Sequence, residues 1–209
     1  GDTIQASILV GRSGAGAGFQ YRRPDNHGAT DLLIDIRRPN WDFIEGVVNG
    51  ISRNRIQLRR THRFGWDLLA SVSLADNRYR TIDLGTGATS LGFEAGLTYR
   101  LADRPIFIQY GVEAEYRQSI LILTAPDGTD YFPVPLLSRE IHFIDASFSR
   151  QWTETCRMEA FAGYGLDRLG GDGPFAGAQL RCEPRSGLGG QLWVDNRLNS
   201  ANTNQAVLR

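Results

Sequence analysis

The strongest constraint on the fold is a period-two alternation over residues 91–117, which read "LGFEAGLTYRLADRPIFIQYGVEAEYR". Every second residue is apolar, aromatic or small up to a break at residues 101–105, and the alternation resumes after it. The residues between them carry carboxylates, guanidinium groups, an amide and glycines. Successive side chains of a β-strand point to opposite faces. Each half therefore predicts a strand with one continuous apolar face and one polar face.

The same pattern recurs along the chain, separated by turn sequences rich in Gly, Pro, Asn and Asp. It predicts about twelve strands of about ten residues, the span of a tilted membrane strand. Short connections such as "RFG", "ADRP" and "TET" alternate with longer ones, expected at residues 78–89, 124–138 and 168–174. Residues 41–52 fit either a strand or a short helix in a loop, and the helix is preferred.

The charge balance excludes one class of function. Basic and acidic residues both number 23, so the formal net charge is +0, whereas nucleic-acid-binding domains are usually basic. The chain contains no lysine, and arginine has the fork geometry that suits fixed ion pairs.

No run approaches the roughly 18 apolar residues of a membrane helix. A transmembrane β-barrel needs no such run, because half of each strand faces its interior.

Two all-β architectures fit the alternation. In a soluble sandwich or a lipocalin-like barrel, the charged residues would form the solvated face. The apolar face, however, mixes Ala, Gly and Tyr evenly and lacks the bulky residues that interdigitate between two packed sheets. The sequence thus favours an antiparallel transmembrane β-barrel over residues 1–209. The residues predicted to line its lumen are Asp35, Arg37, Arg55, Arg59, Glu94, Arg100, Glu113, Glu115, Arg117, Asp145, Arg157, Glu159 and Arg181.

The two cysteines test the strand register. If residues 157–165 and 175–181 form a hairpin, paired residues have numbers with a constant sum, so Cys156 faces Cys182 and Met158 faces Leu180. Every apolar residue then finds an apolar partner. A cross-strand disulfide is sterically feasible at such a pair and would indicate an oxidising compartment. Two free, buried thiols are the alternative.

The sequence predicts no enzyme, metal or cofactor site. The three histidines lie on separate segments without metal-ligand spacing. His142 shares a strand with Ser147 and Ser149, which leaves a lipid-modifying enzyme as a less favoured reading. The stretch "GRSGAGAG" lacks the GK[ST] ending of a phosphate loop. The stretch "PDGTD" has too few carboxylates for a calcium loop and predicts a turn.

Three stretches carry a family resemblance: "FIEGVVNGISRNRIQLRRTHRF", then "DNRYR", then "SLGFEAGLTYRLADRPIFIQYGVEAEY". Over residues 43–116 the chain resembles the C-terminal barrel of outer-membrane exopolysaccharide exporters with tetratricopeptide repeats, most nearly the exporters of the Pel polysaccharide. Exporters of cellulose and poly-N-acetylglucosamine, and a phage-adsorption outer-membrane protein, have a similar build. The family barrel has about sixteen strands, and its helical repeats are expected upstream in a longer chain. The terminal "SANTNQAVLR" departs from the usual aromatic end.

The resemblance implies an outer-membrane pore of a Gram-negative bacterium that conducts a secreted exopolysaccharide out of the periplasm, as in biofilm formation. It implies contacts with the polysaccharide, with outer-membrane lipids and with periplasmic or lipoprotein components of an export complex. Carboxylates such as Glu94, Glu113 and Glu115 would attract a cationic, partly deacetylated sugar chain. The alternative function is a receptor or structural barrel with a closed lumen.

Overall fold

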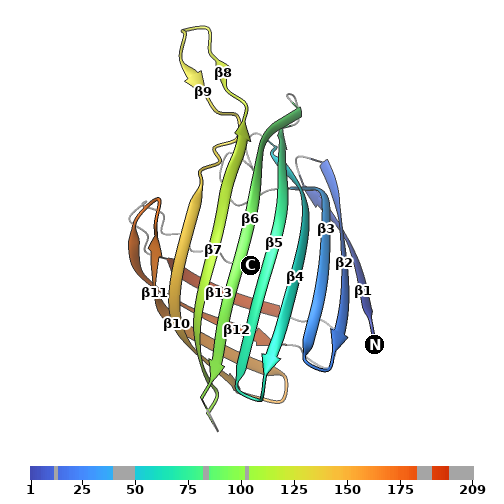
Figure 1. The fold of residues 1–209 in the computed structure, drawn as a ribbon, viewed down its shortest axis with the longest axis vertical. Helices are drawn as coiled ribbons and strands as arrows, with labels where there is room; N and C mark the ends of the chain where they lie inside the picture. The colour runs from blue at the N-terminus through green and yellow to red at the C-terminus, as the bar shows by residue number, and fades with distance from the viewer. Residues whose placement is uncertain (12–13, 40–49, 82–84, 102–103, 183–189, 198–209) are drawn as a thin grey trace. The chain divides into compact units, whose positions relative to one another are not determined.

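The computed structural model shows an antiparallel all-β chain, as the alternation predicts. Eleven strands form one sheet in the order β1-β2-β3-β4-β5-β6-β7-β10-β11-β12-β13, and β8 and β9 form a two-stranded sheet (Figure 1). The structure describes residues 1–11, 14–39, 50–81, 85–101, 104–182 and 190–197. Most of the segment expected to form a helix, residues 40–49, lies outside these ranges. Within them, no helix has the length and apolar character needed to cross a bilayer.

The long strands have between 8 and 16 residues. In chain order the strands are β1 Thr3–Gly11, β2 Gly14–Asp25, β3 Gly28–Pro39, β4 Ser52–Phe64, β5 Leu68–Thr81, β6 Gly85–Arg100, β7 Ile106–Ile120, β8 Leu123–Thr124, β9 Asp130–Tyr131, β10 Arg139–Gln151, β11 Cys156–Asp167, β12 Asp172–Cys182 and β13 Gly190–Arg197.

Contacts within the chain divide it into two units, and β4, β5, β6 and β7 contribute to both. Unit 1 comprises Gly1–His62, Ser71–Glu94 and Ala114–Ser138, and unit 2 comprises Arg63–Ala70, Ala95–Glu113 and Arg139–Arg209. The apolar core of unit 1 is small and contains Ile51, Tyr79, Ala88, Val134 and Leu136.

In unit 1, the register of β2, β3 and β4 keeps like residues together. Ile34 of β3 pairs with Phe19 of β2 and with Ile56 of β4, and the next polar residue, Asp35, pairs with Arg55. Cross-strand neighbours on one face are close enough to interact. The register therefore separates an apolar face from a charged face, because a slip by one residue would exchange the two.

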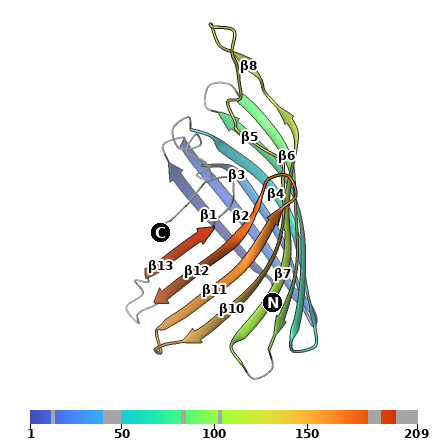
Figure 2. The same cartoon turned by 90° about the vertical axis from the view of Figure 1, so that its left-hand side faces the viewer.

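In unit 2, β11 and β12 lie side by side (Figure 2), and their antiparallel pairing has the predicted register. Cys156 pairs with Cys182 and Met158 with Leu180. The two cysteines form a disulfide with a Cα–Cα distance of 4.2 Å, so the predicted pairing is confirmed.

Two of the predicted long connections are wrong. Strand β5 continues to Thr81 and β6 begins at Gly85, because the alternation extends through Asn77 and Tyr79, which are buried on the polar side. Residues 168–171 form a short turn, in which the side chain of Asp167 accepts a hydrogen bond from the Leu169 amide at 2.9 Å. The third connection is long as predicted, and β8 and β9 lie within it around the predicted "PDGTD" turn.

Candidate functional site on the polar face

The burial of side chains is inverted relative to a water-soluble protein. Gln57 is 6% exposed, while its neighbours Ile56 and Leu58 are 56% and 55% exposed. Ser73 is 3% exposed between Val72 at 43% and Leu74 at 55%. Soluble proteins usually bury the apolar residue and expose the polar one. We call the face that carries Gln57, Ser73 and Glu94 the polar face of unit 1, and the opposite one its apolar face.

Glu94 of β6 is the centre of a hydrogen-bonded network on the polar face of unit 1. Its carboxylate accepts hydrogen bonds from Arg59 Nη2 at 2.6 Å, from Ser73 Oγ at 3.0 Å and from Gln57 Nε2 at 3.4 Å. Arg55 Nη2 donates to its other oxygen at 3.4 Å. The predicted residues Arg55, Arg59 and Glu94 therefore lie together, and the single carboxylate pairs with both guanidinium groups. Bonds of this charge-assisted kind are about twice as strong as neutral ones.

Glu115 of β7 is the centre of a second network in unit 1. Its Oε1 atom accepts hydrogen bonds from Ser90 Oγ at 2.6 Å, from Tyr79 Oη at 2.7 Å and from Asn77 Nδ2 at 3.3 Å. These partners hold the carboxylate from β6, the neighbour of β7, and from β5, the next strand in the sheet. The predicted polar-face residue Glu115 is thus a structural acceptor as well as a charge.

A segment that we call the strap, residues 132–138, adjoins this second network. Val134 is 0% exposed and packs with Tyr79 and Ala88, residues of β5 and β6. Gly87 allows this approach, because a Cβ atom there would lie 2.6 Å from Val134 Cγ2. An apolar segment therefore covers part of the polar face of unit 1.

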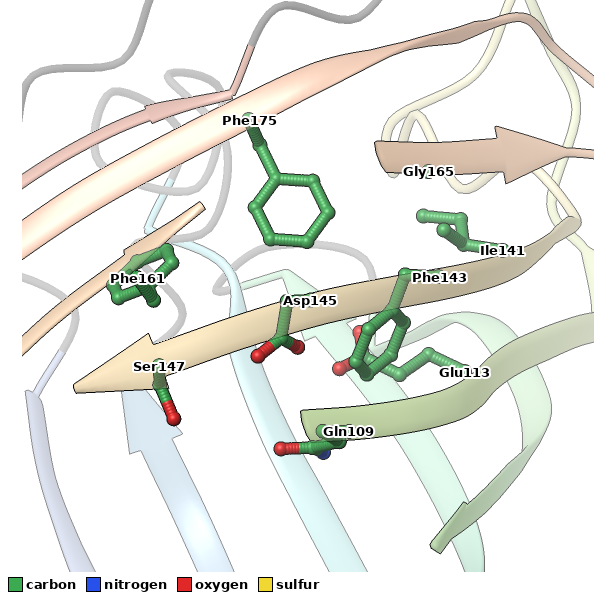
Figure 3. Close-up of a pocket in the computed structure, with 9 residues that line it drawn as sticks. All are labelled: Gln109, Glu113, Ile141, Phe143, Asp145, Ser147, Phe161, Gly165 and Phe175. Carbon is green, nitrogen blue, oxygen red and sulfur yellow. The ribbon is translucent and has the colours of Figure 1, made fainter. Parts of the chain in front are cut away.

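The polar face of unit 2, on β7, β10, β11 and β12, contains an aromatic pocket with a volume of about 300 Å³. Figure 3 shows its carboxylates and phenyl rings on neighbouring strands. It is lined by Gln109, Glu113, Ile141, Phe143, Asp145, Ser147, Phe161, Gly165 and Phe175. Two predicted residues, Glu113 and Asp145, thus lie in one pocket, whose lining includes no basic side chain.

The three phenyl rings of the aromatic pocket form a cluster. The centroids of Phe143 and Phe175 are 6.3 Å apart in an edge-to-face arrangement, and those of Phe161 and Phe175 are 6.2 Å apart. Glycines make room for them. A Cβ atom on Gly111 would clash with the ring of Phe143, and one on Gly163 would lie 2.6 Å from Phe175 Cζ. The glycines of the alternation therefore allow these two rings to lie against the sheet.

The other predicted residues are placed separately. Asp35 is buried and pairs with Arg38 at 3.4 Å. Arg37 has a positive φ of 51° at a register shift between Asp35 and Arg38, so the alternation that predicted its face is interrupted there.

In unit 2, Arg157 pairs with Glu159 at 3.1 Å, and Arg181 lies opposite Arg157 on β12. Arg117 belongs to unit 1, where its backbone amide donates to Ser138 Oγ. Arg100 lines a separate pocket beside the turn between β4 and β5.

The histidine and serine of the enzyme alternative do not meet. Ser147 lines the aromatic pocket. His142 lies an odd number of residues away on β10 and therefore on the opposite face of the strand, where its ring shares a hydrogen bond with Tyr110 Oη at 2.9 Å. Its other ring nitrogen lies 3.0 Å from Glu140 Oε1. The two side chains therefore cannot act as a dyad on one substrate.

The aromatic members of the pocket and the neutral partners of the two glutamates were not predicted from the sequence. Phe143, Phe161 and Phe175 share the parity of the charged residues on their strands, and this is the signal that would have placed them on the polar face.

Comparison with protein-family models, with curated proteins and with solved structures found no match.

Proposed function

We propose that the chain is a transmembrane β-barrel of a bacterial outer membrane, whose polar face lines a conduit for a secreted exopolysaccharide. The observation that carries this proposal is the inverted burial around Gln57 and Ser73. Exposed apolar surface on this scale is costly in water, at about 25 cal/mol per Å², but not in lipid. A closed barrel also satisfies every backbone hydrogen bond within the hydrocarbon layer.

Exposed aromatic residues near strand ends support the membrane assignment. Trp66 and Trp152, at the turns that follow β4 and β10, are 89% and 69% exposed. Tyr99 near the end of β6 and Tyr164 of β11 are also exposed. Tryptophan and tyrosine are enriched where a bilayer meets water.

The aromatic pocket supports a carbohydrate as the transported molecule. Phenyl rings offer flat apolar surfaces to the CH faces of a sugar ring, while Gln109, Ser147 and the two carboxylates can bond its hydroxyl groups. Glu113 and Asp145 give the lining an acidic character that suits a sugar bearing an ammonium group. A polymer must keep sliding, so a conduit needs several weak contacts and no tight site. The proposed partners are the polymer, outer-membrane lipids and periplasmic or lipoprotein components of an export complex.

Conductance and secretion measurements test the proposal. The protein as it occurs in the cell, reconstituted in planar bilayers, should conduct ions, and Glu113→Lys should shift its ion selectivity toward anions and lower polymer output. Glu154→Lys, in the turn between β10 and β11, is the matched control for charge and should change neither. A protein that stays in the aqueous phase on detergent extraction, or a Glu113→Lys protein with unchanged selectivity and output, would refute the proposal.

The strap favours a second function, a receptor or structural barrel with a closed lumen. Val134 and Leu136 pack with Tyr79 and Ala88, two residues of the polar face of unit 1 that a conduit would leave accessible. In that case deletion of the β8–β9 hairpin should abolish function, while variants of the aromatic pocket should not affect it. The opposite result favours the conduit.

A further inference from the structure

A second pocket in unit 2, which we call the arginine pocket, has a volume of about 360 Å³. It lies between the end of β4 and its turn to β5, the end of β6 and the start of β7. Leu69 and Phe107 contribute apolar surface, and Trp66, 89% exposed, lies at its side. The pocket therefore offers an apolar surface that nothing within the described residues covers.

Two arginines, Arg63 and Arg100, are among the residues that line the same pocket. Both residues are exposed, and neither guanidinium forms a hydrogen bond or ion pair with any described residue. The backbone amide of Arg100 donates to the carbonyl oxygen of Asp67 at 2.7 Å, which ties the end of β6 to the β4–β5 turn. The Asp67 carboxylate also lines the pocket, so two arginines and one aspartate leave a net charge of +1.

We propose that the arginine pocket binds a carboxylate carried on an apolar or aromatic body. Arginine matches a carboxylate through two parallel N–H bonds, and Thr98 adds a hydroxyl group to the lining. The apolar body would cover Leu69 and Phe107, and an aromatic one could stack on Trp66. The proposal does not depend on whether the polar face lines a conduit, because no contact of the aromatic pocket enters it.

Titration with 4-phenylbutyrate tests the site, with 4-phenylbutanamide as the uncharged analogue of equal shape. The intact protein should bind the acid at least about tenfold more tightly than the amide, a difference of about 1.4 kcal/mol. The double variant Arg63→Gln/Arg100→Gln should lose this preference. Arg104→Gln, in the turn between β6 and β7, is the matched control and should retain it.

Two further measurements keep the test decisive. Raising the salt concentration should weaken the binding of the acid to the wild-type protein and leave the binding of the amide unchanged. This measurement uses the wild-type protein alone, so it does not depend on the folding of a variant. The blocked peptide acetyl-Leu-Asp-Phe-amide distinguishes the sources of the carboxylate. Tighter binding than the free acid assigns the site to a segment of a partner chain, and weaker binding assigns it to a small molecule. Equal affinity for the acid and the amide, or an unchanged preference in the double variant, would overturn the proposal.

Discussion

Replacing Glu94 by glutamine should destabilise the folded protein by about 2 kcal/mol. The substitution preserves the volume of the side chain but removes the charge that Arg59, Ser73, Gln57 and Arg55 share. Arg55 would then keep a guanidinium without this counter-ion at a position where its side chain is only 20% exposed. The loss should therefore arise mainly from Arg55.

The magnitude follows from the partial burial of the network. Breaking a fully buried ion pair costs about 3–5 kcal/mol, whereas an exposed pair contributes about 0–1 kcal/mol. The side chains of Glu94 and Arg59 are 38% and 47% exposed, so solvent screening reduces their share. Arg59→Gln should accordingly cost less than Glu94→Gln, about 0.5–1 kcal/mol. The double variant should show a coupling energy of about 1 kcal/mol.

Urea unfolding in lipid vesicles, followed by tryptophan fluorescence, measures these differences. Asp76→Asn is the matched control, because Asp76 pairs with Arg78 at 3.1 Å and both side chains are about half exposed or more. Its cost should stay below about 1 kcal/mol. The reasoning fails if Glu94→Gln is no more destabilising than Asp76→Asn, since the polar face would then be as well hydrated as an ordinary surface.

Three further predictions concern the strap, the disulfide and the β8–β9 turn. Gly87→Ala should displace Val134 and cost about 1–3 kcal/mol in the same unfolding assay, with greater protease sensitivity of the strap; unchanged sensitivity would contradict the contact. Cys156→Ser should lower stability by about 2–4 kcal/mol relative to the oxidised protein, and the difference should vanish under reducing conditions. Hydrogen bonds from Thr129 lower the pKa of Asp127. A lowered folded-state pKa means that the stabilisation is present above the unfolded value of about 3.9 and is lost as the pH falls through the folded pKa. The protection of the Thr129 amide, which is the intrinsic exchange rate divided by the observed rate at the same pH, should therefore fall in acid in the wild-type protein and not in Asp127→Asn.

The strands and the cysteine pairing could be predicted because both follow from the two-residue period. Once the period assigns each side chain to a face, a hairpin has few registers that keep apolar residues opposite apolar residues. That condition alone brought Cys156 opposite Cys182. The same rule also placed Arg55 and Glu94 on a common face. The alternation does not say which charges of a face bond to each other, because that depends on side-chain conformations across several strands.

The strap and the aromatic pocket could not be predicted from the period. Val134 reaches the core of unit 1 through a contact between distant segments, and no local pattern around residue 134 indicates its destination. Phe143 and Phe175 are apolar residues at positions of their strands where the alternation predicts polar side chains. Read singly, each is an exception to the pattern, and only the hydrogen-bonded order of β10, β11 and β12 brings them together. Gly111 and Gly163 were the available signal, since residues without a side chain on a polar face leave room for a neighbouring ring.

Glu113 and Glu115 show why two residues on the same face of one strand need not have the same role. Both were predicted to attract a cationic polymer, and they lie two residues apart on β7. Glu115 accepts hydrogen bonds from Tyr79, Ser90 and Asn77, so reversing its charge would leave these donors facing a cation and would destabilise the fold. Glu113 lines the aromatic pocket and forms no hydrogen bond with a described residue. A lost function is therefore informative about transport only for variants of Glu113, whereas the same loss in Glu115→Lys would reflect the missing acceptor.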